Sequence, residues 1–132
     1  MNRTEKNLWK KLKTVLPGAA DRMENTAGTG FPDVYGDSGF RSYWVEMKVA
    51  STQVASDGTK ALKLLRPTQV VWLRRHVSRG ATCLLAVGHT RGVVFYKVLR
   101  VGMKKIIEFS DTFSRENKLL LNAELRQEIE HG

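Results

Sequence analysis

Apolar residues recur at helical spacing in two parts of the chain. Near the start, a stripe of four apolar residues predicts a helix over residues 3–16, which Pro17-Gly18 would end; the stripe is Leu8, Leu12, Val15 and Leu16. A second helix is expected over residues 67–79, because Pro67 suits a first turn and Gly80 suits a helix end. Gln69 would lean inward near the start of this second helix, one turn before Leu73.

Other stretches have the pattern of strands. In residues 40–49, Met47 lies on an apolar face with Tyr43, Val45 and Val49, while Glu46 and Lys48 point to the opposite face. Residues 81–87 are wholly apolar, which is typical of a buried central strand. Further strands are expected over residues 20–27 and 93–101.

The connections between these elements are rich in turn residues. Gly28, Gly30, Gly36 and Gly39 indicate tight turns, and Pro32 fixes the approach of the chain to Asp33. Residues 50–64 are small and polar, so we expect a surface loop of low order, either a mobile flap over substrate or a plain linker.

The order of elements predicts an α/β protein with a central mixed sheet and helices on both sides. At 132 residues the chain is expected to form a single domain, with a core over about 3–101 and a C-terminal extension over about 102–132. The extension contains a charged helical region, which could pack on the sheet or meet a second subunit.

Composition narrows the classes of function. Lys and Arg number 22 against 13 Asp and Glu, and the resulting net charge of +9 favours a polyanionic partner, nucleic acid before an anionic membrane. The single cysteine, Cys83, excludes a disulfide within the chain and a zinc site built from several cysteines. Without a signal-peptide pattern or a membrane-length apolar run, a cytoplasmic protein without a membrane role is expected.

The candidate chemistry lies around a predicted turn and strand. If the strands that carry them are neighbours, Asp33 sits beside Glu46 and Lys48, which gives two carboxylates and one ammonium. Two carboxylates can hold a hard divalent cation such as Mg²⁺ or Mn²⁺. The alternative is a hairpin with an ordinary solvated face. The role of Glu5 also has two alternatives: it could complete a capping box begun by Asn2, or be a further acid at the site.

Seven basic residues are candidates for contacts with nucleic-acid phosphates. They are Arg22, Lys60, Lys63, Arg66, Arg74, Arg75 and Arg79. Solvation alone is the alternative for the helical arginines among them.

These motifs together resemble a known nuclease superfamily. The matching residues are Glu5, Arg22, Gly30-Phe31-Pro32-Asp33, Trp44-Val45-Glu46-Met47-Lys48, Gln69, Trp72-Leu73 and Gly80. In this order and spacing, roughly over residues 3–88, they resemble the PD-(D/E)XK superfamily, and within it the stand-alone virus-type replication-repair nuclease (VRR-NUC) domains. Two departures stand out: the connection 50–64 is longer than usual, and Arg66 replaces the Ser that is common before Pro67.

The resemblance implies a restriction-endonuclease-like fold and a Mg²⁺-dependent endodeoxyribonuclease without an organic cofactor. Such enzymes are often selective for branched DNA or Holliday junctions and often homodimeric. By position, Asp33, Glu46 and the backbone carbonyl of Met47 would be metal ligands, and Lys48 would activate water and stabilise the transition state. Glu5 would support the metal, and Gln69 would orient Lys48 or the substrate.

Two alternatives of a different class stay open. One is a non-catalytic nucleic-acid-binding module, and the other is a basic accessory subunit held to a larger enzyme by residues 104–132.

Overall fold

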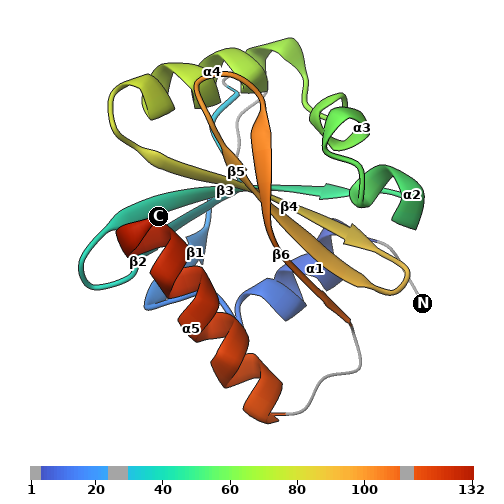
Figure 1. Cartoon of the computed structure of the whole chain (residues 1–132), viewed down its shortest axis with the longest axis vertical. Coiled ribbons are helices and arrows are strands. Elements are labelled where there is room, and N and C mark those ends of the chain that lie inside the picture. The colour runs from blue at the N-terminus through green and yellow to red at the C-terminus, as the bar shows by residue number, and fades with distance from the viewer. Residues whose placement is uncertain (1–3, 24–29, 111–114) are drawn as a thin grey trace.

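One six-stranded sheet organises the protein (Figure 1). The computed structural model describes residues 4–23, 30–110 and 115–132. The strands lie in chain order: β1 (Ala19–Arg22), β2 (Val34–Asp37), β3 (Ser42–Val49), β4 (Thr82–His89), β5 (Gly92–Val98) and β6 (Met103–Ser110). All neighbours are antiparallel except β3 and β4, which are parallel. The predicted mixed sheet is therefore confirmed.

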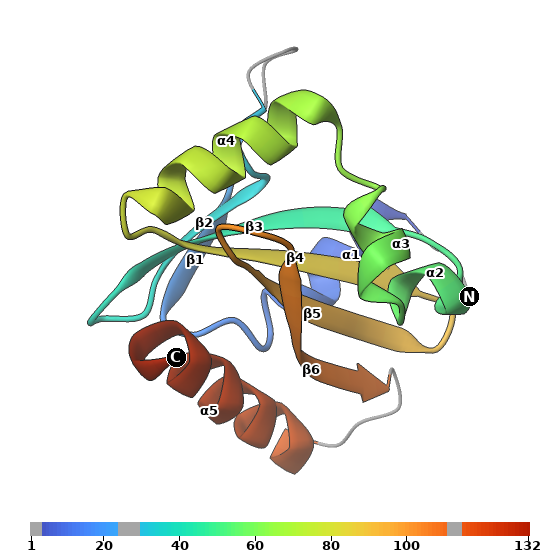
Figure 2. The same ribbon diagram turned by 45° about the horizontal axis from the view of Figure 1, so that its top comes forward.

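Helices cover both faces of this sheet. On one side lie α2 (Thr52–Ala55), α3 (Gly58–Leu62) and α4 (Pro67–Ser78), which together form the crossover between β3 and β4; on the other lie α1 (Glu5–Leu12) and α5 (Arg115–His131) (Figures 1 and 2). Each side has its own apolar cluster, with Met47 in the α1–α5 layer and Leu85 in the α2–α4 layer. The predicted α/β class, with helices on both sides of the sheet, is thereby confirmed.

The strand predicted to be buried is central in the sheet. Every residue of β4 is buried, and β4 lies between β3 and β5. The parallel pairing of β4 with β3 requires a crossover connection, which the three helices α2–α4 supply.

The C-terminal region packs on the sheet. β6 forms its last strand, and α5 buries Leu121, Leu125 and Ile129 in the same cluster as Met47. Of the two arrangements considered for this region, the structure has the first.

The prediction of a low-order loop over residues 50–64 is wrong, because the segment contains α2 and α3. Ser51 and Asp57 cap α2 and α3, since their side chains accept hydrogen bonds from backbone N–H groups of the first turns. Ala55 and Ala61 are fully buried, and the Tyr96 hydroxyl donates a hydrogen bond to the Ala55 carbonyl. The small residues that suggested a loop instead allow two short helices to pack closely on the sheet.

Three smaller predictions differ from the structure: the place of Gly36, the end of the first helix and the extent of the first strand. Gly36 lies within β2 and not in a turn. A glycine is needed at this strand position because the ring of Tyr43 occupies the space where a Cβ would be. The first helix ends at Leu12, after which the Thr14 hydroxyl donates to the Lys11 carbonyl at 2.7 Å. The first strand is Ala19–Arg22, where residues 20–27 were predicted. Residues 24–27 of that prediction, and Gly28, lie outside the described residues.

Candidate active site

The β2–β3 hairpin brings Asp33 and Glu46 together. Val34 pairs with Val45, so Asp33, one residue before β2, lies opposite Glu46 on β3. The Met47 backbone N–H donates to Oδ2 of Asp33 at 2.8 Å, which holds this carboxylate against β3. Met47 itself points to the opposite face and is fully buried there. The alternation along β3 thus separates a chemical face from an apolar face.

Glu46 is a buried acid with an amide partner. Its residue exposure is 2%, which is unusual for a carboxylate. Nε2 of Gln69, in the first turn of α4, donates to Oε2 of Glu46 at 2.9 Å. Oε1 of Gln69 accepts from the Arg66 backbone N–H at 2.9 Å. Gln69 therefore closes the start of α4 and holds Glu46, whereas the sequence led us to expect a contact with Lys48 or the substrate.

The pKa of the Glu46 carboxyl is raised to about 8. Burial is the largest cause, and the neighbouring Asp33 carboxylate adds to it by charge repulsion. Lys48 acts in the opposite direction, and Glu5 raises the value slightly further. Without a cation, this acid is therefore mainly protonated at neutral pH.

Lys48 lies on the same face as Glu46, two positions along β3. Its Nζ is 3.7 Å from Oε2 of Glu46, and its side chain is 18% exposed. An ammonium held beside Glu46 and partly open to solvent can contact an anionic group that approaches from outside.

The two acids are suited to a hard divalent cation. Oε1 of Glu46 is buried and has no hydrogen-bond partner among the described residues, so a cation beside Asp33 would satisfy it. Mg²⁺ usually binds through one or two carboxylates plus substrate phosphate oxygens and waters. No group of three His, Cys, Asp or Glu side chains comes together in the described part of the chain, so the donor set here is the carboxylate pair.

Glu5 is near the pair but bound elsewhere. Thr4 is the N-cap of α1, and its hydroxyl accepts from the Asn7 backbone N–H at 3.1 Å, so Glu5 is the first residue of the helix and not the third residue of a capping box. Asn2, the other residue of that alternative, lies outside the described residues. Oε2 of Glu5 forms an ion pair with Arg22 at 3.7 Å, and both side chains are substantially exposed. This pair lies on the α1 side, since Arg22 shares the sheet face of its partner Val34.

The remaining basic candidates lie around α3 and α4. Lys60, Lys63, Arg66, Arg74, Arg75 and Arg79 are all exposed. Arg66 directly precedes α4, and its backbone N–H bonds Gln69, the residue that also holds Glu46. Arg22 stands apart on the other face.

That four aromatic side chains come together beside the acids was not recognised from the sequence. The ring centroids of Tyr35 and Trp44 are 4.7 Å apart, those of Trp44 and Trp72 are 5.1 Å apart, and those of Trp72 and His76 are 3.6 Å apart. Tyr35 and Trp44 face each other across β2 and β3, on the side that carries Glu46. The sequence contained the signal, because Tyr35 and Trp44 each lie two residues from an acid, the spacing of side chains on one strand face, and Trp72 and His76 are one helical turn apart.

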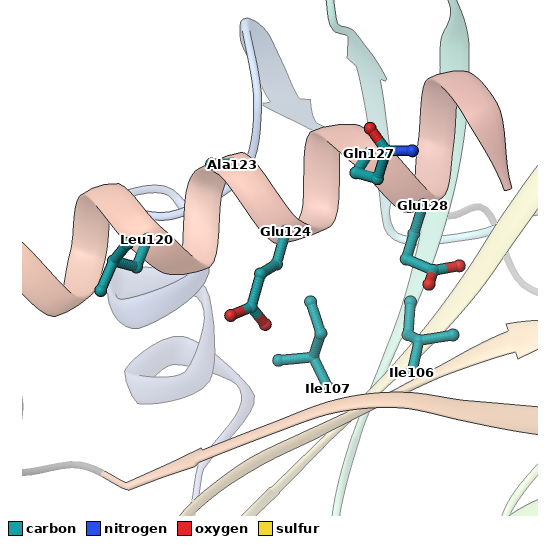
Figure 3. A pocket seen from close by; sticks show the side chains of 7 residues that line it. All are labelled: Ile106, Ile107, Leu120, Ala123, Glu124, Gln127 and Glu128. Atoms are coloured by element: carbon teal, nitrogen blue, oxygen red, sulfur yellow. The ribbon is translucent and has the colours of Figure 1, made fainter.

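A cavity of about 340 Å³ lies in a different place, between α5 and β6 (Figure 3). It is lined by Ile106, Ile107, Leu120, Ala123, Glu124, Gln127 and Glu128. Glu124 and Glu128 extend toward the two isoleucines of β6. An apolar hollow with acidic side chains is a poor site for a polyanion, so the hairpin remains the candidate for nucleic-acid chemistry.

No family model and no curated protein matches the chain. Among solved structures, it is similar to a Holliday junction resolvase, Hjc, from Archaeoglobus fulgidus. The two share 17% sequence identity with a TM-score of 0.40 over 82% of this chain and 86% of that chain. In the described residues no helix has the length and apolar character needed to cross a bilayer.

Proposed function

We propose that this protein is a divalent-metal-dependent endodeoxyribonuclease of the PD-(D/E)XK type, related to VRR-NUC domains, that hydrolyses phosphodiester bonds in branched DNA. The observation that carries the proposal is the meeting of Asp33, buried Glu46 and Lys48 at one hairpin, with Met47 N–H donating to Asp33 at 2.8 Å. The net charge of +9 supports DNA as the partner.

Each side chain has a distinct part in the proposed reaction. Asp33, Glu46 and the Met47 carbonyl would hold Mg²⁺ or Mn²⁺, which supplies charge neutralisation and an activated water when bound. Gln69 fixes the orientation of Glu46 through the 2.9 Å hydrogen bond. Lys48, beside Glu46, stabilises the negative charge that develops on the phosphoryl oxygens. Glu5, which pairs with Arg22, would support the metal through water.

The test is cleavage of a labelled panel of four-way junction, flap, nicked and plain duplex DNA, with and without Mg²⁺ or Mn²⁺. Wild-type protein is expected to cut a branched member fastest and only with a divalent ion. Lys48→Ala is expected to lower the rate by about 100-fold or more, because a charge that stabilises the transition state is lost. Lys105→Ala, an exposed lysine on β6 that pairs with Glu108 at 3.3 Å, is the matched control and should cut normally.

Two results would overturn the proposal. Unimpaired cutting by a folded Glu46→Ala variant would separate the chemistry from this hairpin. Salt-sensitive DNA binding with no product under any divalent ion would identify a non-catalytic nucleic-acid-binding module instead.

A homodimer is part of the proposal. Symmetric incision of a four-way junction needs two active sites related by a two-fold axis. Light scattering with and without junction DNA should therefore give a mass of two chains. A single-chain mass under both conditions, together with paired incision, would contradict the dimer but not the nuclease.

A further inference from the structure

The four rings next to the acids form a continuous series across two layers. Tyr35 and Trp44 are tilted by 60° at 4.7 Å, Trp44 meets Trp72 edge to face, and Trp72 and His76 are nearly parallel at 11°. Nδ1 of His76 lies 2.7 Å from the Trp72 carbonyl, which fixes the imidazole over the indole. The series therefore runs from the β2–β3 hairpin onto the flank of α4.

This series starts beside the candidate active site. Tyr35 is two residues after Asp33 on one strand, and Trp44 is two residues before Glu46 on the other. Two residues of strand span about 7 Å. That length is comparable with one extended nucleotide, so a base on the rings and a phosphate at the acids could belong to neighbouring positions of one strand.

The rings are only partly covered. All four are half-buried, and Trp44 and Trp72 pack on one side against the apolar cluster beneath α2–α4. β1, the neighbour of β2, exposes Asp21 directly opposite Tyr35, so the sheet beyond the tyrosine is open to solvent.

Charges around the rings are arranged for a nucleic-acid strand. Arg75 and Arg79 follow Trp72 and His76 at a spacing of three residues and are exposed, which puts two guanidinium groups on this flank of α4. Arg41, exposed at the turn before β3, bonds the Gly80 carbonyl at 3.5 Å. Asp21, a negative charge, lies beside Tyr35 at the other end of the series. A neutral base is therefore suited to the Tyr35 end, and phosphates are suited to the His76 end, where the arginines lie.

We propose that Tyr35, Trp44, Trp72 and His76 are a stacking platform for unpaired bases of a single-stranded segment next to the scissile bond. Aromatic stacking tolerates any base, because every base has a π-face, and the arginines supply the phosphate contacts. The inference rests on the proposed function for its placement, and it adds the single-stranded character of the substrate at this position.

Binding of a short labelled oligothymidylate, about 12 nucleotides long, tests the platform in EDTA, where no cleavage occurs. Tyr35→Thr keeps a strand-forming residue but removes the ring, and is expected to weaken binding by about tenfold. Tyr35→Phe keeps the ring and loses only the 2.9 Å bond to Ser42, so it should bind like the wild type. Trp72→Leu should weaken binding in the same way as Tyr35→Thr.

An oligonucleotide of the same length without bases separates stacking from charge. Wild-type protein should bind it more weakly than oligothymidylate, and Tyr35→Thr should weaken its binding no further. Quenching of tryptophan emission by oligothymidylate should persist in Trp9→Phe, because Trp9 packs on the other face of the sheet. The platform is excluded if folded Tyr35→Thr and Trp72→Leu bind oligothymidylate like the wild type, or if the base-free strand binds equally well.

This experiment is independent of the nuclease assay. If ring-dependent binding is found but no DNA is cut with any divalent ion, the platform stands and the proposed function fails. If DNA is cut and the ring variants bind and cut like the wild type, the platform alone fails.

Discussion

At the residue scale, the protonation of Glu46 makes the stability of the protein depend on pH. In the folded protein its pKa is about 8, against 4.5 for an unperturbed glutamate, because the carboxyl is buried beside Asp33. Between these two values the folded state binds more protons than the unfolded state. Stability therefore falls as pH rises from about 5 to 8, with a slope of up to about 1.4 kcal/mol per pH unit.

Glu46→Gln should remove that pH dependence. The amide can still accept from Gln69 but does not titrate, so the metal-free variant should have a flatter stability profile and be more stable than the wild type at pH 8. Urea unfolding in EDTA at several pH values measures this directly. The groups that face Glu46, namely Asp33, Lys48, Gln69 and the more distant Glu5, are unchanged in the comparison. Parallel profiles for the two proteins would contradict the assignment.

The absence of a side chain at Gly36 makes room for the ring of Tyr43 in the hairpin. A Cβ there would lie 2.1 Å from Cζ of Tyr43, whose hydroxyl donates to the Pro17 carbonyl at 2.7 Å. Gly36→Ala should therefore destabilise the protein by about 1–3 kcal/mol through overpacking. Gly58→Ala in α3 is the control: its nearest neighbour would be at 3.6 Å, and the helix should gain a few tenths of a kcal/mol or more. Equal melting temperatures for the two variants would show that the ring moves aside.

At the scale of elements, the Tyr96 hydroxyl of β5 is one of the contacts that hold α2 on the sheet. Tyr96→Phe removes the hydrogen bond to the Ala55 carbonyl. We expect protection of the α2 amides, such as Ala55 N–H to the Ser51 carbonyl, to fall about fivefold in hydrogen exchange, because one net hydrogen bond is worth about 1 kcal/mol. Tyr35→Phe, which removes an exposed bond to Ser42, should leave α2 unaffected. Unprotected α2 amides in the wild type would restore the interpretation of this segment as a flap.

Elements with a strong period were predictable from the sequence, and elements fixed by distant partners were not. Helix 67–79 and the buried strand 81–87 follow from apolar spacing, and the structure has them as α4 and β4. The segment 50–64 looked like a loop because its buried residues are alanines, whose burial depends on the sheet beneath. Gly36 looked like a turn because its reason, the ring of Tyr43, lies across the strand pair.

The same distinction holds for the site. Hairpin pairing was enough to expect Asp33 beside Glu46, and the structure puts them opposite each other. The partner of Gln69 was not predictable, because it depends on where the first turn of α4 lies over β3. The aromatic series joins a hairpin to a helix, so no local pattern contains all of it.

For the whole molecule, the distribution of charge matters more than its sum. Lys60, Lys63 and Arg66 lie on the α3–α4 side, whereas Lys6, Lys10 and Lys13 are exposed on or next to α1 on the other side. Replacing the first three by Gln should lower the slope of log Kd against log salt by about 0.9 for each DNA phosphate that is no longer neutralised. Replacing the α1 lysines by Gln removes the same charge and should leave the slope unchanged. Identical slopes for the two triple variants would show that DNA prefers neither face.

The last turn of α5 is tied to the bend between β2 and β3. The Ser38 hydroxyl donates to Oε2 of Glu130, and Nη1 of Arg126 donates both to the Ser38 carbonyl and, at 3.3 Å, to the same Glu130. This bend joins the strands that present Asp33 and Glu46. During synthesis, the hairpin therefore gains this brace from α5 only after residue 130 has left the ribosome.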